Sequence, residues 1–372
     1  MRKKSFLLAL CLLLAVVLLA ACGQPASDPA SVGDEQQENI ESDSTQEEAS
    51  ERTITDMAGR TVTLPAEVAT GLGTGAIGSY MLYTLDPDTM VGVNYEFNDQ
   101  EKAYILPEYQ DLPSFGQGDG LNLEAVISAA PDVLISYGTI SDSVINEADG
   151  FQEQTGIPCV VLDGTMDAIP EAYRVLGQVF GMEERAEELA VYAEEALAFA
   201  ESIDIPEEEQ VTVYFGNGLE NLETAPLGSW HAELLDMVDA KNVAVVEGEV
   251  TARIDVSAEQ VIGWNPQVIL LNGEPTEGMS PQQAVESFLA DSRYQNVQAV
   301  LDGQVYAIPK YPYSWFDRPP GPNRLIGIYW LAELLYPDQF DLNIQDEAKE
   351  YYSLYYHMDL TDEQLADLLG YE

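Results

Sequence analysis

The chain has 372 residues and carries 65 acidic side chains against 15 basic ones, a formal net charge of −50. A surface this negative repels nucleic acid and anionic lipid, so we expect no nucleic-acid partner. About 320 residues follow the polar N-terminal region. That length is too great for one small core and suits two lobes.

The first 21 residues predict export. Residues 2–4 are basic, an apolar run extends over Phe6–Leu19, and small residues lead to Cys22. A charged start, an apolar stretch of this length and a small-residue cleavage site are typical of a secretory signal. A cysteine directly after the small residues matches the bacterial lipobox, although an ordinary signal with a chance cysteine is the alternative. We therefore predict a lipid anchor on Cys22 that holds the protein on the extracytoplasmic face of the cell membrane.

A polar tether follows the predicted anchor. Residues 22–52 are acidic, rich in Ser and Gln, and lack any aromatic side chain. Such a segment cannot bury enough apolar surface to offset its ordering entropy, so we expect it to be disordered. Cys159, the one cysteine beyond the tether, lies in an apolar run and is expected to be a small buried residue.

Strand and helix patterns alternate along the rest of the chain. Two alternating stretches around an Asp-Met-Ala-Gly-Arg turn predict a hairpin, and short apolar runs then lead into Gly-rich or aromatic loops and helical stretches. This alternation predicts an α/β fold of two Rossmann-like lobes with mostly parallel sheets, joined by a long connecting helix in which Gly181 is a candidate break. The expected segments are an N-terminal lobe over 53–168, the connecting helical segment over 169–203, a C-terminal lobe over 204–345 and a helical tail over 346–372.

Two segments, one in each predicted lobe, echo each other. Asn122–Ile127 is followed by Ala130–Ile135, and Val256–Val261 is followed by Asn265–Ile269. Each pair places a Glu at a helix start and a Pro before an apolar strand. Together with the opening hairpin and Ser314–Leu325, their order and spacing resemble the class III solute-binding proteins that serve ABC importers of siderophores, haem and cobalamin.

This resemblance implies a binding protein, not an enzyme, that delivers its ligand to an ABC permease dimer with its ATPase. We expect the protein itself to be a monomer. Members of this family dock through one surface glutamate on each lobe, and Glu124 and Glu259 occupy the matching positions. Both residues could also act only as first-turn acids that stabilise a helix dipole. The two interpretations are compatible.

Ligand contacts are expected from loops at the carboxyl ends of the strands, where an open sheet forms its crevice. The candidates are rich in aromatic side chains, whose flat faces and polar tips suit a macrocycle or an aromatic chelator. They are Tyr95, Phe115, Tyr137, Phe215, Trp230, His231, Arg253, Tyr313, Trp315 and Arg318, together with the loop Gly73–Gly75.

The expected ligand is a small-molecule metal complex, and no intrinsic cofactor is predicted. An iron complex, either a siderophore or haem, is the first candidate, and a corrinoid such as cobalamin or a nickel or cobalt chelate is the alternative. His231 could bind a metal axially, although a lone histidine is more often a surface or capping residue. Arginine is scarce, which disfavours a strongly anionic chelate because such ligands need several guanidinium groups.

Two other classes of protein are the alternatives to an importer component. A secreted hydrolase could use some of the many acids, but the sequence has no nucleophile elbow, no His-Glu-x-x-His and no paired-cysteine motif. A sensory lipoprotein could have the same two lobes, and an adjacent permease gene would distinguish a transporter from it.

Overall fold

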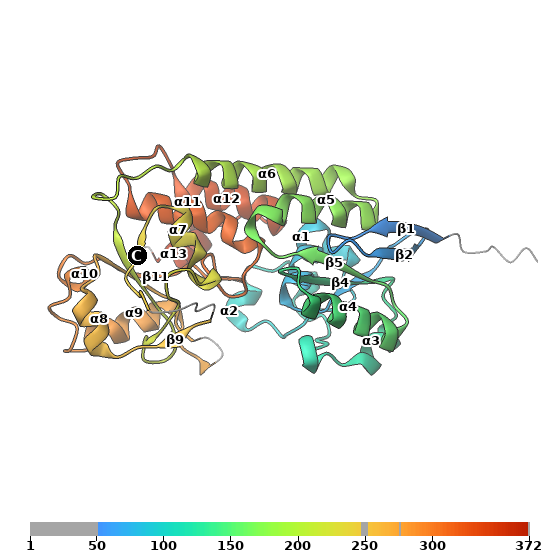
Figure 1. Cartoon of the computed structure of the whole chain (residues 1–372), viewed down its shortest axis with the longest axis horizontal. Coiled ribbons are helices and arrows are strands. Elements are labelled where there is room, and N and C mark those ends of the chain that lie inside the picture. The colour runs from blue at the N-terminus through green and yellow to red at the C-terminus, as the bar shows by residue number, and fades with distance from the viewer. Residues whose placement is uncertain (1–50, 247–251, 275–276, 371–372) are drawn as a thin grey trace, which may run out of the picture. The chain divides into compact units, whose positions relative to one another are not determined.

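The computed structural model describes residues 51–246, 252–274 and 277–370. The predicted signal, Cys22 and the tether before Glu51 lie outside these residues. The described residues belong to one unit of the chain, Glu48–Glu372. Within this unit, long helices cover one side of two α/β lobes (Figure 1). No helix in the described part of the chain is long and apolar enough to cross a membrane.

The N-terminal lobe begins with the predicted hairpin, formed by β1 (Glu51–Thr55) and β2 (Thr61–Pro65), which pair antiparallel. The Asp56 side chain closes its turn by accepting hydrogen bonds from the backbone N–H groups of Ala58 and Arg60. A parallel sheet follows, in the order β3-β4-β5. Its strands are β3 (Gly71–Gly73), β4 (Val133–Gly138) and β5 (Cys159–Asp163).

The apolar run at the start of β4 is fully buried, as expected for a strand covered on both faces by helices. Cys159 is also buried, as predicted, and burial raises the pKa of its thiol to about 12. The helices of this lobe are α1 (Ala76–Leu85), α2 (Asp99–Lys102), α3 (Leu123–Ala129) and α4 (Asp142–Thr155).

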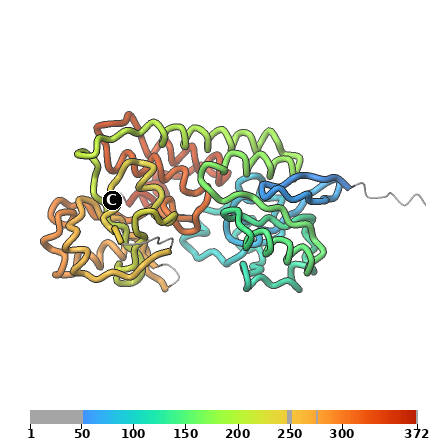
Figure 2. The backbone as a smooth tube through the Cα atoms, viewed as in Figure 1, coloured from blue at the N-terminus to red at the C-terminus, as the bar shows by residue number. Residues whose placement is uncertain are grey.

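The connecting segment is two helices rather than one, α5 (Ile169–Phe180) and α6 (Glu183–Ser202). Gly181 ends α5 in the left-handed conformation, with φ of 67°. The two helices then pack side by side (Figure 2). They approach closely at Gly177, where a Cβ atom would lie 2.4 Å from that of Ala186. Of the two possibilities that the sequence left open, a continuous helix and a helical segment broken at Gly181, the structure has the second.

The C-terminal lobe is built on a parallel sheet of four strands in the order β11-β10-β6-β8. These strands are β6 (Thr212–Gly216), β8 (Lys241–Asn242), β10 (Val268–Leu271) and β11 (Val305–Ala307), and a small antiparallel ribbon joins β7 (Glu223–Thr224) to β9 (Ile254–Asp255). The helices of this lobe are α7 (Glu233–Met237), α8 (Ala258–Trp264), α9 (Pro281–Ala290), α10 (Gln298–Leu301) and α11 (Leu325–Leu335).

The tail folds as α12 (Ile344–Tyr355) and α13 (Asp362–Leu369) and packs against both lobes. The Tyr351 hydroxyl lies 2.6 Å from that of Tyr80 on α1, while Trp315 of the C-terminal lobe donates to the Tyr352 hydroxyl at 3.3 Å. Several buried tyrosines of α12 thus lie between the lobes. This aromatic packing ties the lobes together and favours a small relative motion.

Candidate functional site

A cavity of about 430 Å³ lies where the strands β3, β4 and β5 end. Gly75, Thr139 and Thr165, which follow these three strands, line it from the N-terminal lobe. Trp230 and Arg324 line it from the C-terminal lobe. The carboxyl edge of a parallel sheet is the common place for a ligand site, and a volume of this size suits a small ligand.

The start of α1 forms one wall of this cavity through a glycine pattern, Gly73-x-Gly75-x-x-Gly78. A Cβ atom on Gly73 would lie 2.3 Å from the backbone nitrogen of Ser79, and one on Gly78 would lie 2.6 Å from the carbonyl oxygen of Ile135. Glycine is therefore required for α1 to begin this close to the sheet. No side chain caps the helix, so no side-chain oxygen competes with a ligand for its first N–H groups.

Two residues of the cavity wall each have a buried hydrogen-bond donor without a partner in the described part of the chain. These donors are the Tyr137 hydroxyl, on β4, and Nε of Arg324, in the short helix Pro322–Arg324. Burial raises the pKa of Tyr137 well above its usual range, opposed in part by the Arg324 guanidinium, so the hydroxyl keeps its proton. A buried donor without a partner is costly, and a ligand acceptor would remove that cost.

Arg324 is held in place by other groups of the C-terminal lobe. Its Nη1 donates to the Trp230 carbonyl at 3.2 Å and to Oε2 of Glu233 at 3.1 Å. Glu233 also lines the cavity and is partly exposed. Among the described residues, the cavity wall therefore carries one guanidinium and one carboxylate, and Nε of Arg324 has no protein partner.

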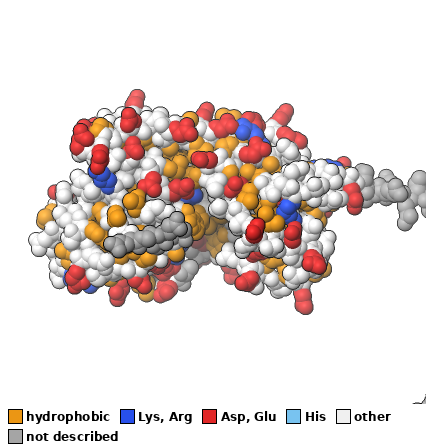
Figure 3. Space-filling view, in the orientation of Figure 1, with side chains coloured by type: hydrophobic (Ala, Val, Ile, Leu, Met, Phe, Trp, Pro, Cys, Tyr) orange, Lys and Arg blue, Asp and Glu red, His pale blue; other side chains and the backbone are white. Residues whose placement is uncertain are grey.

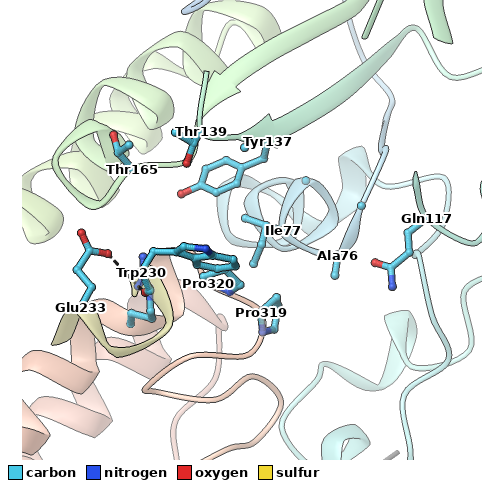
Figure 4. Close-up of a pocket in the computed structure, with 15 residues that line it drawn as sticks. Ala76, Ile77, Gln117, Tyr137, Thr139, Thr165, Trp230, Glu233, Pro319 and Pro320 are labelled. Atoms are coloured by element: carbon cyan, nitrogen blue, oxygen red, sulfur yellow. Dashed lines mark hydrogen bonds and ion pairs between the residues drawn. The ribbon is translucent and has the colours of Figure 1, made fainter. Parts of the chain in front are cut away.

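Tyr137 and Trp230 approach the cavity from opposite walls (Figure 4). Trp230 is 45% exposed, which is high for a tryptophan, and its indole stacks on the His231 ring with centroids 3.7 Å apart. Two predicted ligand residues are thus brought together with the predicted loop at Gly75. The cavity wall therefore carries one aromatic side chain from each lobe.

Three other predicted ligand residues are engaged in an ion-pair network inside the C-terminal lobe. The fully buried Asp317 lies 2.7 Å from Nδ1 of His231 and also pairs with Arg253. Glu223 pairs with both Arg253 and Arg318, at 3.5 Å each. Carboxylates of the protein pair with both of these cations, and neither Arg253 nor Arg318 lines the cavity, although Nε of Arg253 is also buried without a partner. Across the described residues, no group of three or more His, Cys, Asp or Glu is placed to hold a metal ion.

The remaining predicted aromatics lie in the hydrophobic core or between the lobes, away from the cavity wall. Phe215 is fully buried in β6 against Phe316, with ring centroids 4.4 Å apart. Phe115 packs in the core of the N-terminal lobe, and Trp315 is buried against α12. Tyr95 and Tyr313 pack edge to face with each other, 6.2 Å between centroids. None of these five side chains lines the cavity, so their assignment as ligand residues stays a prediction that this cavity does not support.

The sequence prediction missed Glu233, the role of Arg324 and the start of α1 beyond Gly75. The full G-x-G-x-x-G pattern, following a strand and opening a helix, was a readable signal for an anion-binding helix start. No comparable local signal marks Glu233, because its place on the cavity wall depends on Arg324, 91 positions away.

Together, the two α/β lobes with parallel sheets and the cavity between the strand ends of the N-terminal lobe and residues of the C-terminal lobe define a solute-binding protein. The periplasmic binding protein family matches residues 79–312, more than half of the chain, and the chain belongs to this family. It is a substrate-binding protein of an ABC importer and not an enzyme.

Three relatives illustrate the similarity. The molybdate-binding protein MolA of Haemophilus influenzae is 25% identical over 82% of this chain and 91% of its own length. The uncharacterized ABC transporter substrate-binding lipoprotein YvrC of Bacillus subtilis is 25% identical, over 91% of this chain and 99% of its own. The structure of an ABC transporter solute-binding protein from Sulfurospirillum deleyianum matches with a TM-score of 0.75 and 29% identity, over 86% of this chain and 99% of that one.

Proposed function

We propose that the cavity binds a small oxyanion, which the protein delivers to an ABC permease. The observation that carries this proposal is the pair of unpartnered donors, the Tyr137 hydroxyl and Nε of Arg324, beside the uncapped start of α1. Hydrogen bonds from a guanidinium to an oxyanion are charge-assisted, and a helix N-terminus adds backbone N–H groups and a favourable dipole.

The charge of the cavity favours one small anion over a large polyanionic complex. Arg324 is the one cationic side chain on the described cavity wall, and Glu233 pairs with it. Arg253 and Arg318 are neutralised by their own carboxylate partners. A chelate with several negative charges needs several free guanidinium groups, whereas a tetrahedral oxyanion can use one guanidinium, one hydroxyl and a helix start. The similarity to a protein named for molybdate binding supports this class of ligand.

A compact metal chelate, such as a small iron complex, is the second candidate. It is favoured by the aromatic rings of Tyr137 and Trp230, which lie on opposite walls of the cavity, and Trp230 is 45% exposed. A flat chelator could lie between these rings while its anionic edge meets Arg324. Haem and a corrinoid are larger flat metal complexes. To fit either one, the lobes would have to lie farther apart, because the cavity has a volume of about 430 Å³.

We also propose that the protein acts at the extracytoplasmic face of the membrane, anchored through lipid on Cys22. The small residues before this cysteine and the polar segment after it support the proposal. The lipoprotein named above, which spans most of this chain, supports it as well. Radiolabelled palmitate incorporated by the wild-type chain but not by Cys22→Ala would test it.

Calorimetry with the purified full chain tests the ligand proposal. Molybdate, tungstate and sulfate should bind, with Arg324→Gln abolishing the signal, while ferric siderophores, haem, cobalamin and nickel chelates serve as the competing set. A ligand present at 100 times its dissociation constant stabilises the folded state by about 2.7 kcal/mol, so thermal unfolding provides a parallel screen. Binding of a chelate without binding of any oxyanion would replace the first candidate with the second.

A further inference from the structure

Another hollow in the surface lies between α6, the longer connecting helix, and α12, the first helix of the tail. It has a volume of about 380 Å³ and shares no lining residue with the ligand cavity. The Tyr355 hydroxyl of α12 donates to the Leu189 carbonyl of α6 at 2.9 Å, and the rings of Tyr192 and Tyr355 pack edge to face, 5.5 Å between centroids. We call this hollow the α6–α12 groove.

Five glutamates line the α6–α12 groove. They are Glu184, Glu187, Glu188 and Glu195 of α6 and Glu350 of α12. Glu187 pairs with Arg174 at 2.8 Å, and Glu188 pairs with Arg185 at 3.1 Å. Within the described part of the chain the other three form no ion pair, so the groove has three carboxylates that no basic side chain neutralises. Acidic side chains gather along this edge of the molecule, over α6 (Figure 3).

Tyr192 adds a buried polar group to the groove wall. It is 5% exposed, and its hydroxyl has no hydrogen-bond partner among the described residues. Burial raises the pKa of this hydroxyl well above its usual range, and Tyr329 and the carboxylates of Glu347 and Glu350 raise it further. The hydroxyl therefore keeps its proton and lies near the acids of the groove. Leaving it unpaired is costly, and a ligand in the groove would remove that cost.

Like charges from both helices act on Glu347, one turn before Glu350 on α12. Burial raises the pKa of the Glu347 carboxyl group, and the carboxylates of Glu350, Asp346 and Glu195 raise it further. Glu195 belongs to α6, so the repulsion crosses from one helix to the other. A cation in the groove would be attracted by carboxylates of both helices.

The carboxylates are too far apart to share one metal ion. Across the residues that the structure describes, no group of three or more His, Cys, Asp or Glu is placed to hold one. Glu184 and Glu195 lie on the same face of α6, about three turns or about 16 Å apart along its axis. Val191, which is 40% exposed, lies between them, and Leu354 lines the groove from α12. Separated carboxylates with apolar surface between them fit an extended cation whose charges are separated by methylene groups.

We propose that the α6–α12 groove is a second binding site, and that its ligand is a linear aliphatic oligoamine. The ammonium groups of this ligand contact Glu184, Glu195 and Glu350, while its methylene groups lie against Val191 and the Tyr192 ring. A divalent ion or a short diamine reaches only part of this set. A bound oligoamine bridges α6 to α12, which packs against both lobes, so it stabilises the folded chain whether or not the ligand cavity is filled.

Calorimetry of the purified full chain with spermine, at physiological ionic strength, tests this site. One spermine should bind per chain, and putrescine, a shorter diamine, should bind more weakly because it cannot span the groove. Glu195→Gln and Glu350→Gln should each lower the affinity about fivefold, and the double variant about twenty-five-fold. Tyr192→Phe, which removes only the hydroxyl, should lower it about tenfold. Val191→Lys should abolish binding, because it places a cation at an exposed position in the groove.

Glu153→Gln is the matched control, because Glu153 is an exposed glutamate of α4 that forms no ion pair with any described residue and lies outside the groove. The proposal is overturned if this control weakens spermine binding as much as the groove variants do. It is also overturned if Mg²⁺ displaces spermine at an equal concentration of charge, since either result shows only diffuse screening of an acidic surface. Molybdate should titrate every variant as it titrates wild type. Failure of molybdate to bind wild type concerns the proposed function alone, because spermine binding does not use the ligand cavity.

Discussion

Replacing Tyr137 with Phe should affect ligand binding and stability in opposite directions. The change removes one hydroxyl and keeps the ring, and that hydroxyl is buried without a hydrogen-bond partner in the ligand-free protein. A hydrogen bond to a charged group contributes about 1.5–3 kcal/mol, so affinity for an oxyanion should fall about tenfold to a hundredfold. An unpartnered buried hydroxyl costs free energy, so the ligand-free Tyr137→Phe protein should be as stable as wild type or more stable, by up to about 1 kcal/mol.

Tyr294→Phe is the matched control for this experiment. The Tyr294 hydroxyl is also buried without a partner, but it lies in a separate core cluster of the C-terminal lobe. This variant should show a similar small gain in stability and no change in affinity. Calorimetry gives the affinity, and urea denaturation of the ligand-free proteins gives the free energy of unfolding. The reasoning is refuted if Tyr137→Phe loses stability by more than about 1 kcal/mol while its affinity is unchanged.

Four further variants test other parts of the structure. Gly78→Ala should destabilise the protein by about 1–3 kcal/mol in urea denaturation, since its Cβ would lie 2.6 Å from the Ile135 carbonyl oxygen, whereas Gly75→Ala, whose Cβ meets nothing within 4 Å, should be tolerated. Burial lowers the pKa of Lys310 from 10.5 to about 8, so the unfolded chain binds more protons between these values and stability should rise with pH there, by at most about 3 kcal/mol. Lys310→Met should remove that rise in a pH series of denaturation curves. Trp230→Phe should remove the change in tryptophan fluorescence on ligand binding, because Trp230 is the exposed indole on the cavity wall.

Local patterns of the sequence predicted the strands and the internal repetition. The hairpin, which was predicted from Thr53 and begins at Glu51, follows from alternation, and the buried strands β4 and β10 follow from short apolar runs. Both signals depend only on neighbouring residues. The shared order of a Glu at the start of α3 or α8 and a Pro before the next strand is local in the same sense. Gly181 marked the break between α5 and α6 for a local reason, its left-handed conformation.

The ligand-facing side chains could not be predicted in this way. Phe215 and Trp230 were predicted as ligand residues for the same reason, as aromatic side chains near strand ends. Phe215 is buried in the core, whereas Trp230 is exposed. Arg253 donates a hydrogen bond to the carboxylate of Asp317, which is 64 positions away, and does not line the cavity. Such outcomes depend on partners distant in the chain, and a list of residue types near strand ends does not contain them.

Glu233 allows the sign of the ligand's charge to be measured. Its carboxylate lies 3.1 Å from Nη1 of Arg324 and is partly exposed on the cavity wall. Glu233→Gln removes one negative charge while keeping the shape of the side chain. At about 4 Å in a high-dielectric setting, one unit charge contributes about 1 kcal/mol, so affinity for an anion should rise about fivefold, and more at low ionic strength.

Glu233→Gln should also change the stability of the ligand-free protein. Arg324 is buried, and loss of its carboxylate partner leaves a less compensated charge, so Glu233→Gln should lower the free energy of unfolding before ligand is added. An oxyanion that takes the place of the lost carboxylate should restore more stability in this variant than in wild type. A neutral or cationic chelate has no such charge to offer, so its affinity should stay unchanged or fall. Parallel titrations with molybdate and with a neutral ferric hydroxamate therefore distinguish the two ligand classes by the direction of one change.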